Sequence, residues 1–275
     1  EEVFAGYGIT FEYVDVRDLA LVGKRMRPET KLVFIETPSN PMMQISDIAA
    51  LSALAHENGA LLAVDNTFLS PHFQKPLTLG ADIVLHSGTK YLCGHNDVIA
   101  GFLVLKDATS AQAKRIELLA KSAGPNLSAL DSWLMLRSIK TLGVRVERQA
   151  ENALAIARWL GTLPEVTEVL YPGLADHPGY ALQQKQASGA GGMISFKVCS
   201  AELAKAALGR LHLIAFAESL GGVETLLTYP IAQTHAEMPA ALLKRTGLDD
   251  KLLRLSVGIE DVEDLKADLQ QALQG

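Results

Sequence analysis

The sequence contains only two cysteines, Cys93 and Cys199, which lie far apart and show no paired spacing of the kind that marks disulfide frameworks or zinc sites. It also has no basic stripe, because the formal net charge of -6 is spread over segments of mixed sign. Binding to a phosphate backbone depends on such a stripe, so nucleic acid is not expected as a partner. No apolar run approaches the roughly 20 residues that a membrane helix needs. We therefore expect a soluble protein of a reducing, cytoplasmic compartment with no membrane association.

Repeats and low-complexity tracts are also absent, so the chain is not a solenoid or a disordered linker. With 275 residues and 48% hydrophobic content it can bury a large core, and one large or two unequal domains are expected. The start has no Met and no signal-peptide pattern, and it leads directly into Phe11–Val14, which is typical of a strand. We expect that an N-terminal part of the fold is missing from this sequence.

In the first half, apolar runs of strand length alternate with periodic segments of helix length. This alternation favours βαβ units and a buried, mostly parallel sheet, so the predicted class is α/β. The predicted strands are Lys31–Glu36, Ala60–Asp65, Ala81–His86 and Gly101–Leu105. A helix is predicted over Asp47–Asn58, ending at Gly59.

Three of these strands run directly into polar loops, at Thr37–Asn40, Asn66–Thr67 and Ser87–Lys90. Ligands of open α/β sheets bind beyond the carboxyl ends of the strands. We therefore expect the three loops to converge on one crevice.

The second half begins with a stretch from Ser128 to about Leu160 that is nearly free of helix breakers, and a single long helix bridging two domains is predicted there. Strands are then expected at Val166–Tyr171, Met193–Val198, near Leu213–Ala217 and at Leu252–Val257, with helices at Ala201–Leu208 and Val262–Leu273. These elements form a smaller α+β domain. The predicted division places residues 1–137 in a large domain and residues 138–275 in the small one.

The segment from Ala81 to Tyr91 carries the strongest local signal, a buried strand that ends in two hydroxyls and a lysine. Ser87 and Thr89 can donate to a phosphate, and Lys90 can form a Schiff base with an aldehyde where its surroundings favour the neutral amine. The alternative is an ordinary surface lysine in a polar loop, because such short motifs arise by chance.

Asp65 ends the apolar run that precedes it, which brings a carboxylate into the same crevice. A carboxylate there can keep the ring nitrogen of pyridoxal 5'-phosphate (PLP) protonated, and the protonated ring is the electron sink that stabilises a carbanion. The alternative role for Asp65 is a helix N-cap.

Several motifs together resemble the cystathionine γ-synthase/γ-lyase family of PLP enzymes in their order and approximate spacing. They are Glu36–Pro41, Val64–Thr67, His86–Tyr91 with Gly94–Asp97, Ser219–Glu224, Thr234–His235 and Leu253–Glu260. The resemblance runs from end to end. It implies the fold-type I architecture, with a large domain of mostly parallel sheet, a small C-terminal domain, amino-acid substrates and a homotetramer built from dimers.

The resemblance also assigns the cofactor contacts by position. Lys90 matches the Schiff-base lysine, Asp65 the partner of the pyridine nitrogen, and Ser87 and Thr89 the phosphate-binding hydroxyls. Asn40 matches the asparagine that contacts both the phenolic oxygen of PLP and the substrate carboxylate.

For the substrate, Ser219 lies where the family helps to hold the substrate or the lysine, and Arg254 matches the arginine that binds the α-carboxylate. The planar fork of an arginine suits a carboxylate. Without the family, Arg254 would be interpreted as an ordinary arginine at a strand edge. His86, His95 and Asp97 match no standard zinc spacing, so no metal is expected.

In the family, a preceding stretch supplies a phosphate loop, a tyrosine stacked on the cofactor, and a tyrosine and an arginine given to the neighbouring subunit. This sequence aligns only beyond that stretch. A catalytically silent subunit or truncated binding module is therefore an alternative from a different class.

The reaction is predicted from Glu218, which matches the glutamate of γ-acting members, although it can also be a solvated side chain beside the site. The stretches Thr225–Pro230 and Gln233–Pro239 look most like bacterial cystathionine γ-synthase or O-acetylhomoserine thiol-lyase. The predicted function is γ-replacement on an O-acyl-homoserine with cysteine as acceptor. The alternative is cystathionine γ-lyase, which performs γ-elimination.

Overall fold

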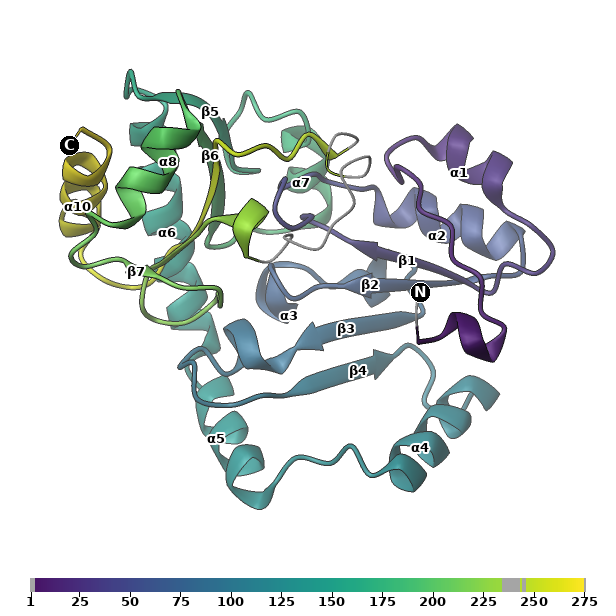
Figure 1. Cartoon of the computed structure of the whole chain (residues 1–275). Helices are drawn as coiled ribbons and strands as arrows, with labels where there is room; N and C mark the ends of the chain where they lie inside the picture. The colour runs from purple at the N-terminus through teal and green to yellow at the C-terminus, as the bar shows by residue number, and fades with distance from the viewer. Residues whose placement is uncertain (1–2, 234–242, 244–245, 275) are drawn as a thin grey trace.

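This computed structural model describes residues 3–233, 243 and 246–274 of the chain. Two β-sheets form its framework, with the helices packed around them (Figure 1). The first sheet has the order β1-β2-β3-β4 and contains β1 (Leu32–Glu36), β2 (Leu61–Asp65), β3 (Ile83–Ser87) and β4 (Gly101–Leu105). Strands β1, β2 and β3 are parallel, and β4 is antiparallel to β3. The predicted α/β class with a mostly parallel sheet is confirmed.

The second sheet has the order β5-β6-β9-β8-β7. Its strands are β5 (Val166–Leu170), β6 (Met193–Val198), β7 (Ala215–Phe216), β8 (Leu226–Thr228) and β9 (Leu252–Ser256). The pairs in this sheet are antiparallel except for β7 with β8.

The described helices surround the two sheets (Figure 1). They are α1 (Leu19–Arg25), α2 (Ile48–Glu57), α3 (Ser70–Phe73), α4 (Ala111–Ala123), α5 (Ala129–Ile139), α6 (Leu142–Leu160), α7 (Tyr180–Gln186), α8 (Ala201–Leu208) and α10 (Val262–Gln274). Short turns of other helix types are η1 (Ala5–Tyr7), η2 (Pro76–Leu79), η3 (Gly88–Leu92, π-helical) and η4 (Pro230–Ala232). None of the described helices is long and apolar enough to cross a membrane.

Local sequence explains the helix that covers the first sheet. The Asp47 side chain accepts a hydrogen bond from Ala50 N at 2.9 Å and so caps the start of α2. Beyond its end, Gly59 has a φ of +70°, a left-handed conformation that favours glycine. Leu51 and Ala55 of α2 are buried on the sheet together with Val64 of β2. The predicted helix and its glycine end are confirmed.

The two faces of the first sheet differ. Because side chains alternate along a strand, Ile35, Leu62 and Val64 point to the face that α2 covers. On the opposite face Phe34 is 54% exposed and Leu103 is 52% exposed. The register places the polar residues at the ends of β1, β2 and β3 on this second, more open face.

The second sheet is covered on one face by α6, α8 and α10 (Figure 1). The apolar cluster between them and the strands includes Ile156 of α6, Ala204 of α8 and Leu269 of α10, packed on Phe196 of β6 and Leu255 of β9. This core keeps β6 and β9 in place.

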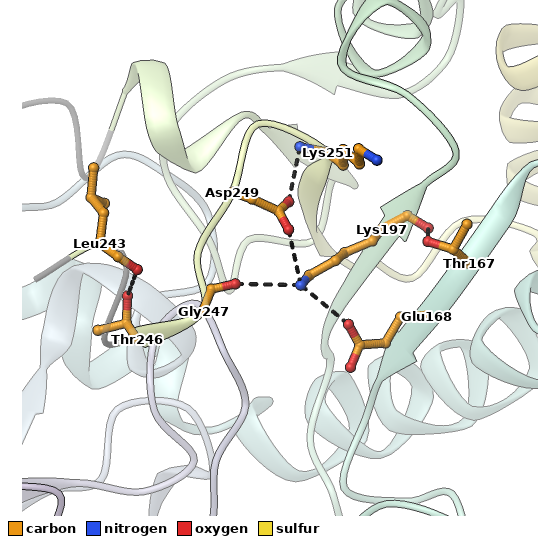
Figure 2. A network of polar contacts seen from close by, with 8 residues as sticks. All are labelled: Thr167, Glu168, Lys197, Leu243, Thr246, Gly247, Asp249 and Lys251. Carbon is orange, nitrogen blue, oxygen red and sulfur yellow. Dashed lines mark hydrogen bonds and ion pairs between the residues drawn. The ribbon is translucent and has the colours of Figure 1, made fainter. Parts of the chain in front are cut away.

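A polar network fixes the turn before β9 (Figure 2). The Lys197 ammonium forms ion pairs with Glu168 at 3.3 Å and Asp249 at 3.1 Å and donates to Gly247 O at 3.3 Å. Its side chain is only 18% exposed. The network therefore ties β5, β6 and the approach to β9 together.

Two expected elements are wrong. Residues 11–14 form no β-ladder within the described part of the chain; instead Val14 and Val16 pack by their side chains against the core around α2. The expected single helix from Ser128 to Leu160 is two helices, α5 and α6, that are separated at Lys140 and Thr141. The Ser138 carbonyl accepts from Thr141 Oγ1 at 3.1 Å and from Arg145 Nη2 at 3.1 Å, so side chains occupy a group that a continuous helix would use.

Candidate active site

The carboxyl ends of β1 and β2 present two neighbouring carboxylates. Glu36 and Asp65 are register partners at the last position of their strands. Asp65 Oδ1 accepts from Thr67 N at 3.0 Å and from Thr67 Oγ1 at 2.5 Å, and Thr67 Oγ1 in turn accepts from Ser87 N at 2.9 Å. The alternative role considered for Asp65 was a helix N-cap, and its contacts with Thr67 do cap the turn that follows β2. One oxygen of Asp65 is held by the turn, and the same contacts fix the end of β3.

Lys90 lies in η3, directly after β3. Its Nζ donates to Ser219 Oγ at 3.2 Å. Burial lowers the pKa of the Lys90 amine, and the nearby positive charge of Arg254 lowers it further, whereas Glu218 raises it. The neutral amine, which is the form that can react with an aldehyde, is therefore more accessible here than at an ordinary lysine.

A buried arginine holds η3 from behind. Arg145, only 4% exposed, donates from Nη1 to Tyr91 O at 2.9 Å and from Nη2 to Leu92 O at 3.4 Å. Gly94 has a φ of +71° and lies against this guanidinium, where a side chain would collide with it. The segment that carries Lys90 is therefore fixed at both ends, by β3 and by Arg145.

The loop after Ser219 packs tightly on η3. Gly221 has a φ of +75°, and a Cβ there would lie 2.7 Å from Tyr91 N. Gly221 N donates to Ser256 Oγ at 2.7 Å, and Val223 N donates to Gly94 O at 2.9 Å. The paired glycines of this motif thus allow the close approach that brings Ser219 to Lys90.

Arg254 is a buried cation, 1% exposed, that projects from β9. Its Nη1 donates to Asn40 Oδ1 at 2.8 Å, and its Nη2 donates to Glu218 O at 2.9 Å and to Thr228 Oγ1 at 3.1 Å. Nε is buried and makes no hydrogen bond to the described residues. Burial lowers the pKa of this guanidinium to about 10, so it carries its charge at neutral pH.

The loop after β1 is held against the second sheet. Ser195 of β6, which pairs with Arg254 in the register, donates from Oγ to Pro41 O at 2.6 Å. Asn40 N donates to Glu36 Oε2 at 2.8 Å. Asn40 is therefore fixed by its backbone to the first sheet and by its side chain to the second.

The predicted convergence of the three loops is confirmed. One chain of contacts joins Lys90, Ser219, Arg254 and Asn40, and a second joins Asp65 to the end of β3. Glu36 links the two, since it bonds to Asn40 and neighbours Asp65.

The predicted site side chains differ in how many hydrogen bonds they make within the protein. Thr89 Oγ1 accepts from Ala100 N at 3.0 Å and lies 3.3 Å from Ala100 O, so it secures the start of β4. The Ser87 hydroxyl makes no hydrogen bond to another described residue. Glu218 is exposed, and only its backbone oxygen contacts Arg254. The ligand roles of all these residues stay predictions.

Sequence reasoning missed Glu36 as a site residue. The pKa of its carboxyl is raised to about 7, chiefly by burial and also by the neighbouring charge of Asp65, while the Asn40 N–H and Arg254 oppose the rise. The available signal was its place at the end of a predicted strand beside the Asn40 loop. The same signal predicted Asp65 as a site residue.

Two of the motifs named in the sequence lie outside the described residues. They are Thr234–His235 and most of Gln233–Pro239. Among the residues that are described, no three histidine, cysteine or acidic side chains gather as metal ligands.

The chain is similar to known enzymes along nearly its whole length. A family model described as the Cys/Met metabolism PLP-dependent enzyme matches residues 1–274. The chain is 48% identical to cystathionine gamma-lyase of Bacillus subtilis over 97% of its own length and 70% of the relative's. It is 45% identical to cystathionine beta-lyase MetC of the same organism, over 99% of this chain and 69% of that protein.

Solved structures agree with the fold. The structure of cystathionine gamma-lyase from Lactobacillus plantarum, complexed with L-serine, matches with a TM-score of 0.95 at 41% identity. That of metB from Corynebacterium glutamicum matches with a TM-score of 0.95 at 43% identity. Each match covers 100% of this chain, and 71% and 70% of the respective solved chains.

Proposed function

The chain belongs to the Cys/Met metabolism PLP-dependent enzyme family, and from that membership we propose that it is a cystathionine γ-lyase. The proposal rests on one arrangement above all: Lys90, with a lowered amine pKa, contacts Ser219 beside the buried Arg254–Asn40 pair. The relatives carry the names of cystathionine gamma-lyase and cystathionine beta-lyase, which favours the lyase alternative over the γ-synthase first predicted from the sequence.

The cofactor of this family is PLP, and the donor set of the site fits it. A primary amine, a carboxylate and a hydroxyl are needed for its aldehyde, its ring nitrogen and its phosphate. Lys90 supplies an amine with a lowered pKa, and Asp65 supplies a carboxylate at the open face of the sheet. Ser87 lies on that same face with its hydroxyl unengaged by the described protein. We infer that these three residues hold the cofactor, with Thr89 and Asn40 as further contacts.

When bound, PLP supplies an electron sink that stabilises negative charge at the substrate Cα. The Lys90 amine is placed to act as the base at that carbon, because burial lowers its pKa and its Nζ is oriented by the hydrogen bond to Ser219 Oγ. A γ-elimination needs protons moved at Cα and at Cβ. The Lys90 amine, on its flexible side chain, can move protons at both carbons.

Substrate binding follows from Arg254 and Asn40. The guanidinium is held by Asn40 Oδ1 and by backbone and hydroxyl oxygens, so it is oriented by uncharged groups and makes no ion pair with a carboxylate of the described residues. We infer that it binds the α-carboxylate of the amino acid, as a planar fork does best. Ser219 and Glu218 border the same space.

Glu218 favours γ over β chemistry within this proposal. It immediately precedes Ser219, it is exposed, and its charge acts on both Lys90 and Arg254. An acid at this place suits a substrate whose reacting bond lies one carbon farther from Cα. The relatives named cystathionine beta-lyase make this the choice that needs a direct test.

Product analysis with cystathionine provides that test. A γ-lyase releases cysteine and 2-oxobutanoate with ammonia, whereas a β-lyase releases homocysteine and pyruvate with ammonia. We expect the first pair. Pyruvate as the main keto acid would replace this proposal with β-elimination and remove the role given to Glu218.

Cystathionine γ-synthase stays a second candidate, favoured by Glu218 and by the likeness of residues 225–230 to γ-replacing enzymes. An O-acyl-homoserine together with cysteine would then yield cystathionine. If this flux exceeds cleavage of cystathionine, the synthase assignment is the correct one.

We further propose three properties of the whole protein. The domains divide between residues 137 and 138, into a large unit around the first sheet and a small unit around the second. The presence of two separate sheets supports this division. The protein acts in the cytoplasm, as its two unpaired cysteines favour. It assembles as a homotetramer, since α5 exposes Leu130, Trp133 and Leu136 at 64%, 59% and 67%. Light scattering on the eluting protein measures the assembly directly.

A further inference from the structure

Glu36 lies between the two parts of the site, and its side chain has no role in the proposed reaction. It neighbours Asp65 in the register, and its Oε2 accepts from Asn40 N at 2.8 Å. The side chain of the same Asn40 accepts from Arg254 Nη1 at 2.8 Å. Glu36 therefore acts on Arg254 twice, mechanically through Asn40 and electrostatically through its own charge.

Glu36 can change how strongly the charge of Arg254 attracts an anion. Among the described residues, the hydrogen bonds of Arg254 go to uncharged oxygens, on Asn40, Glu218, Ser219 and Thr228. A neutral Glu36 leaves the guanidinium available to an incoming anion. An ionised Glu36 adds a negative charge in the same buried region and competes with that anion.

We propose that Glu36 is a positioning residue whose protonation tunes the affinity of Arg254 for a carboxylate ligand. The neutral acid holds Asn40 in place and leaves Arg254 free to bind the ligand. Binding of the carboxylate is then accompanied by uptake of a proton on Glu36. This inference rests on the proposed role of Arg254 in substrate binding.

Other charges face the same region and must be separated from Glu36. Asp65 from β2 and Arg254 from β9 face Glu36 directly. Lys90 from η3 and Glu218 from the loop before β8 act on Arg254 by their charges, and the charge of Asp65 acts on His86 of β3. The carboxyl pKa of about 7 for Glu36 places its ionisation in the range where enzymes are assayed. Lys90 and His86 also have lowered pKa values, so a comparison of variants is required to isolate Glu36.

Glu36→Gln is the decisive variant because glutamine resembles the protonated acid in shape and still offers an oxygen to Asn40 N. Glu57→Gln is the matched control: the same chemical change at the exposed last residue of α2. Thermal unfolding of each variant establishes that it is folded before binding is measured.

The experiment is calorimetric titration of the PLP-loaded protein with butyrate, a carboxylate without an amino group that cannot react with an aldehyde. Titrations at pH 6, 7 and 8, in two buffers of different ionisation heat, give the affinity and the number of protons taken up. A single linked proton changes the affinity by at most about tenfold per pH unit.

We expect butyrate binding by the unmodified protein and by Glu57→Gln to weaken about tenfold from pH 6 to pH 8, with proton uptake near pH 7. In Glu36→Gln the affinity should stay close to the value of the unmodified protein at pH 6, and the uptake should fall. Any pH dependence from other groups persists in all three proteins, so the difference isolates Glu36.

Three outcomes overturn the inference in distinguishable ways. Equal pH dependence in Glu36→Gln and in the unmodified protein refutes the role of Glu36 and leaves Arg254 as the carboxylate site. Absence of butyrate binding at every pH refutes the carboxylate site itself, and with it the premise. A purely structural Glu36 would lower the affinity at all pH values equally, which also refutes the proposal.

Discussion

Lys90 Nζ and Ser219 Oγ lie 3.2 Å apart although 129 residues separate them in the chain. This hydrogen bond joins the turn after the third strand of the first sheet to the loop that leads into β8 of the second. The site is therefore formed between the two sheets, and correct packing of one on the other is a condition for activity.

Replacing Ser219 by alanine should lower kcat about tenfold or more, because the Lys90 amine loses the partner that orients it. The KM for cystathionine should change less. Steady-state kinetics over a range of pH measures both, and Ser122→Ala on the exposed side of α4 is the control. A tenfold rise in KM at constant kcat would instead make Ser219 a residue of substrate binding only.

Arg254→Lys keeps the positive charge and removes the planar fork. We expect the KM for the amino acid to rise at least about tenfold, with a smaller effect on kcat, since carboxylate binding persists through the ground state and the transition state. The lost bonds to Asn40 and Glu218 should also lower the free energy of unfolding by about 1–3 kcal/mol. Arg158→Lys, on the exposed side of α6, controls for the chemical change. Kinetics and denaturant melts equal to those of the control would refute both roles.

Stability should depend on pH through Glu36. Its folded pKa of about 7 exceeds the ordinary value of 4.5, so the folded state holds this proton more tightly than the unfolded chain. The contribution is fully present below about pH 4.5 and is lost as the pH rises through 7, with an upper limit of about 3 kcal/mol. Urea unfolding between pH 5 and 8 tests this. The slope attributable to Glu36 should be absent from Glu36→Gln, and a slope unchanged by that substitution would contradict the assignment.

Asp268 should stabilise the small domain with the opposite pH dependence. Its carboxylate accepts from the backbone N–H groups of His212, Leu213 and Ile214 at 2.8–2.9 Å. Burial alone would raise its pKa, and these bonds lower it below the ordinary value of 3.8. Its contribution is therefore present at neutral pH and is lost on acidification.

Asp268→Asn should cost about 1–3 kcal/mol at neutral pH, because an amide has one oxygen for the N–H groups that two carboxylate oxygens now serve. Asp264→Asn, exposed on the same helix, is the control. Equal melting temperatures for the two variants would show that these hydrogen bonds contribute little.

The sequence predicted those parts of the fold that depend on local pattern. The strands Gly101–Leu105 and Met193–Val198 and the helix Ala201–Leu208 have the predicted bounds, because apolar periodicity and end-capping residues are local signals. The break between α5 and α6 was not predictable, because the Arg145 side chain that helps to form it is held by η3, which is distant in the sequence. Residues 11–14 have the composition of a strand, and composition does not reveal whether a neighbouring strand is available.

The site was predicted for the residues that follow strand ends, and the resemblance of the motifs supplied the rest. Lys90 and Asp65 could be singled out from their positions after buried strands. Arg254 could not, because only the fold shows that it is buried and aimed at Asn40. Glu36 was missed because its environment, with Asp65 and Asn40 on either side, is created by strand pairing.

The attachment of the cofactor to Lys90 is the central claim of this account. Borohydride reduction of the protein loaded with PLP, followed by proteolysis and mass spectrometry, identifies the lysine that carries the pyridoxyl group. We predict a single adduct on Lys90, with loss of the visible cofactor absorbance on reduction and no adduct in Lys90→Ala. An adduct on a different lysine, or none in the unmodified protein, would contradict the account.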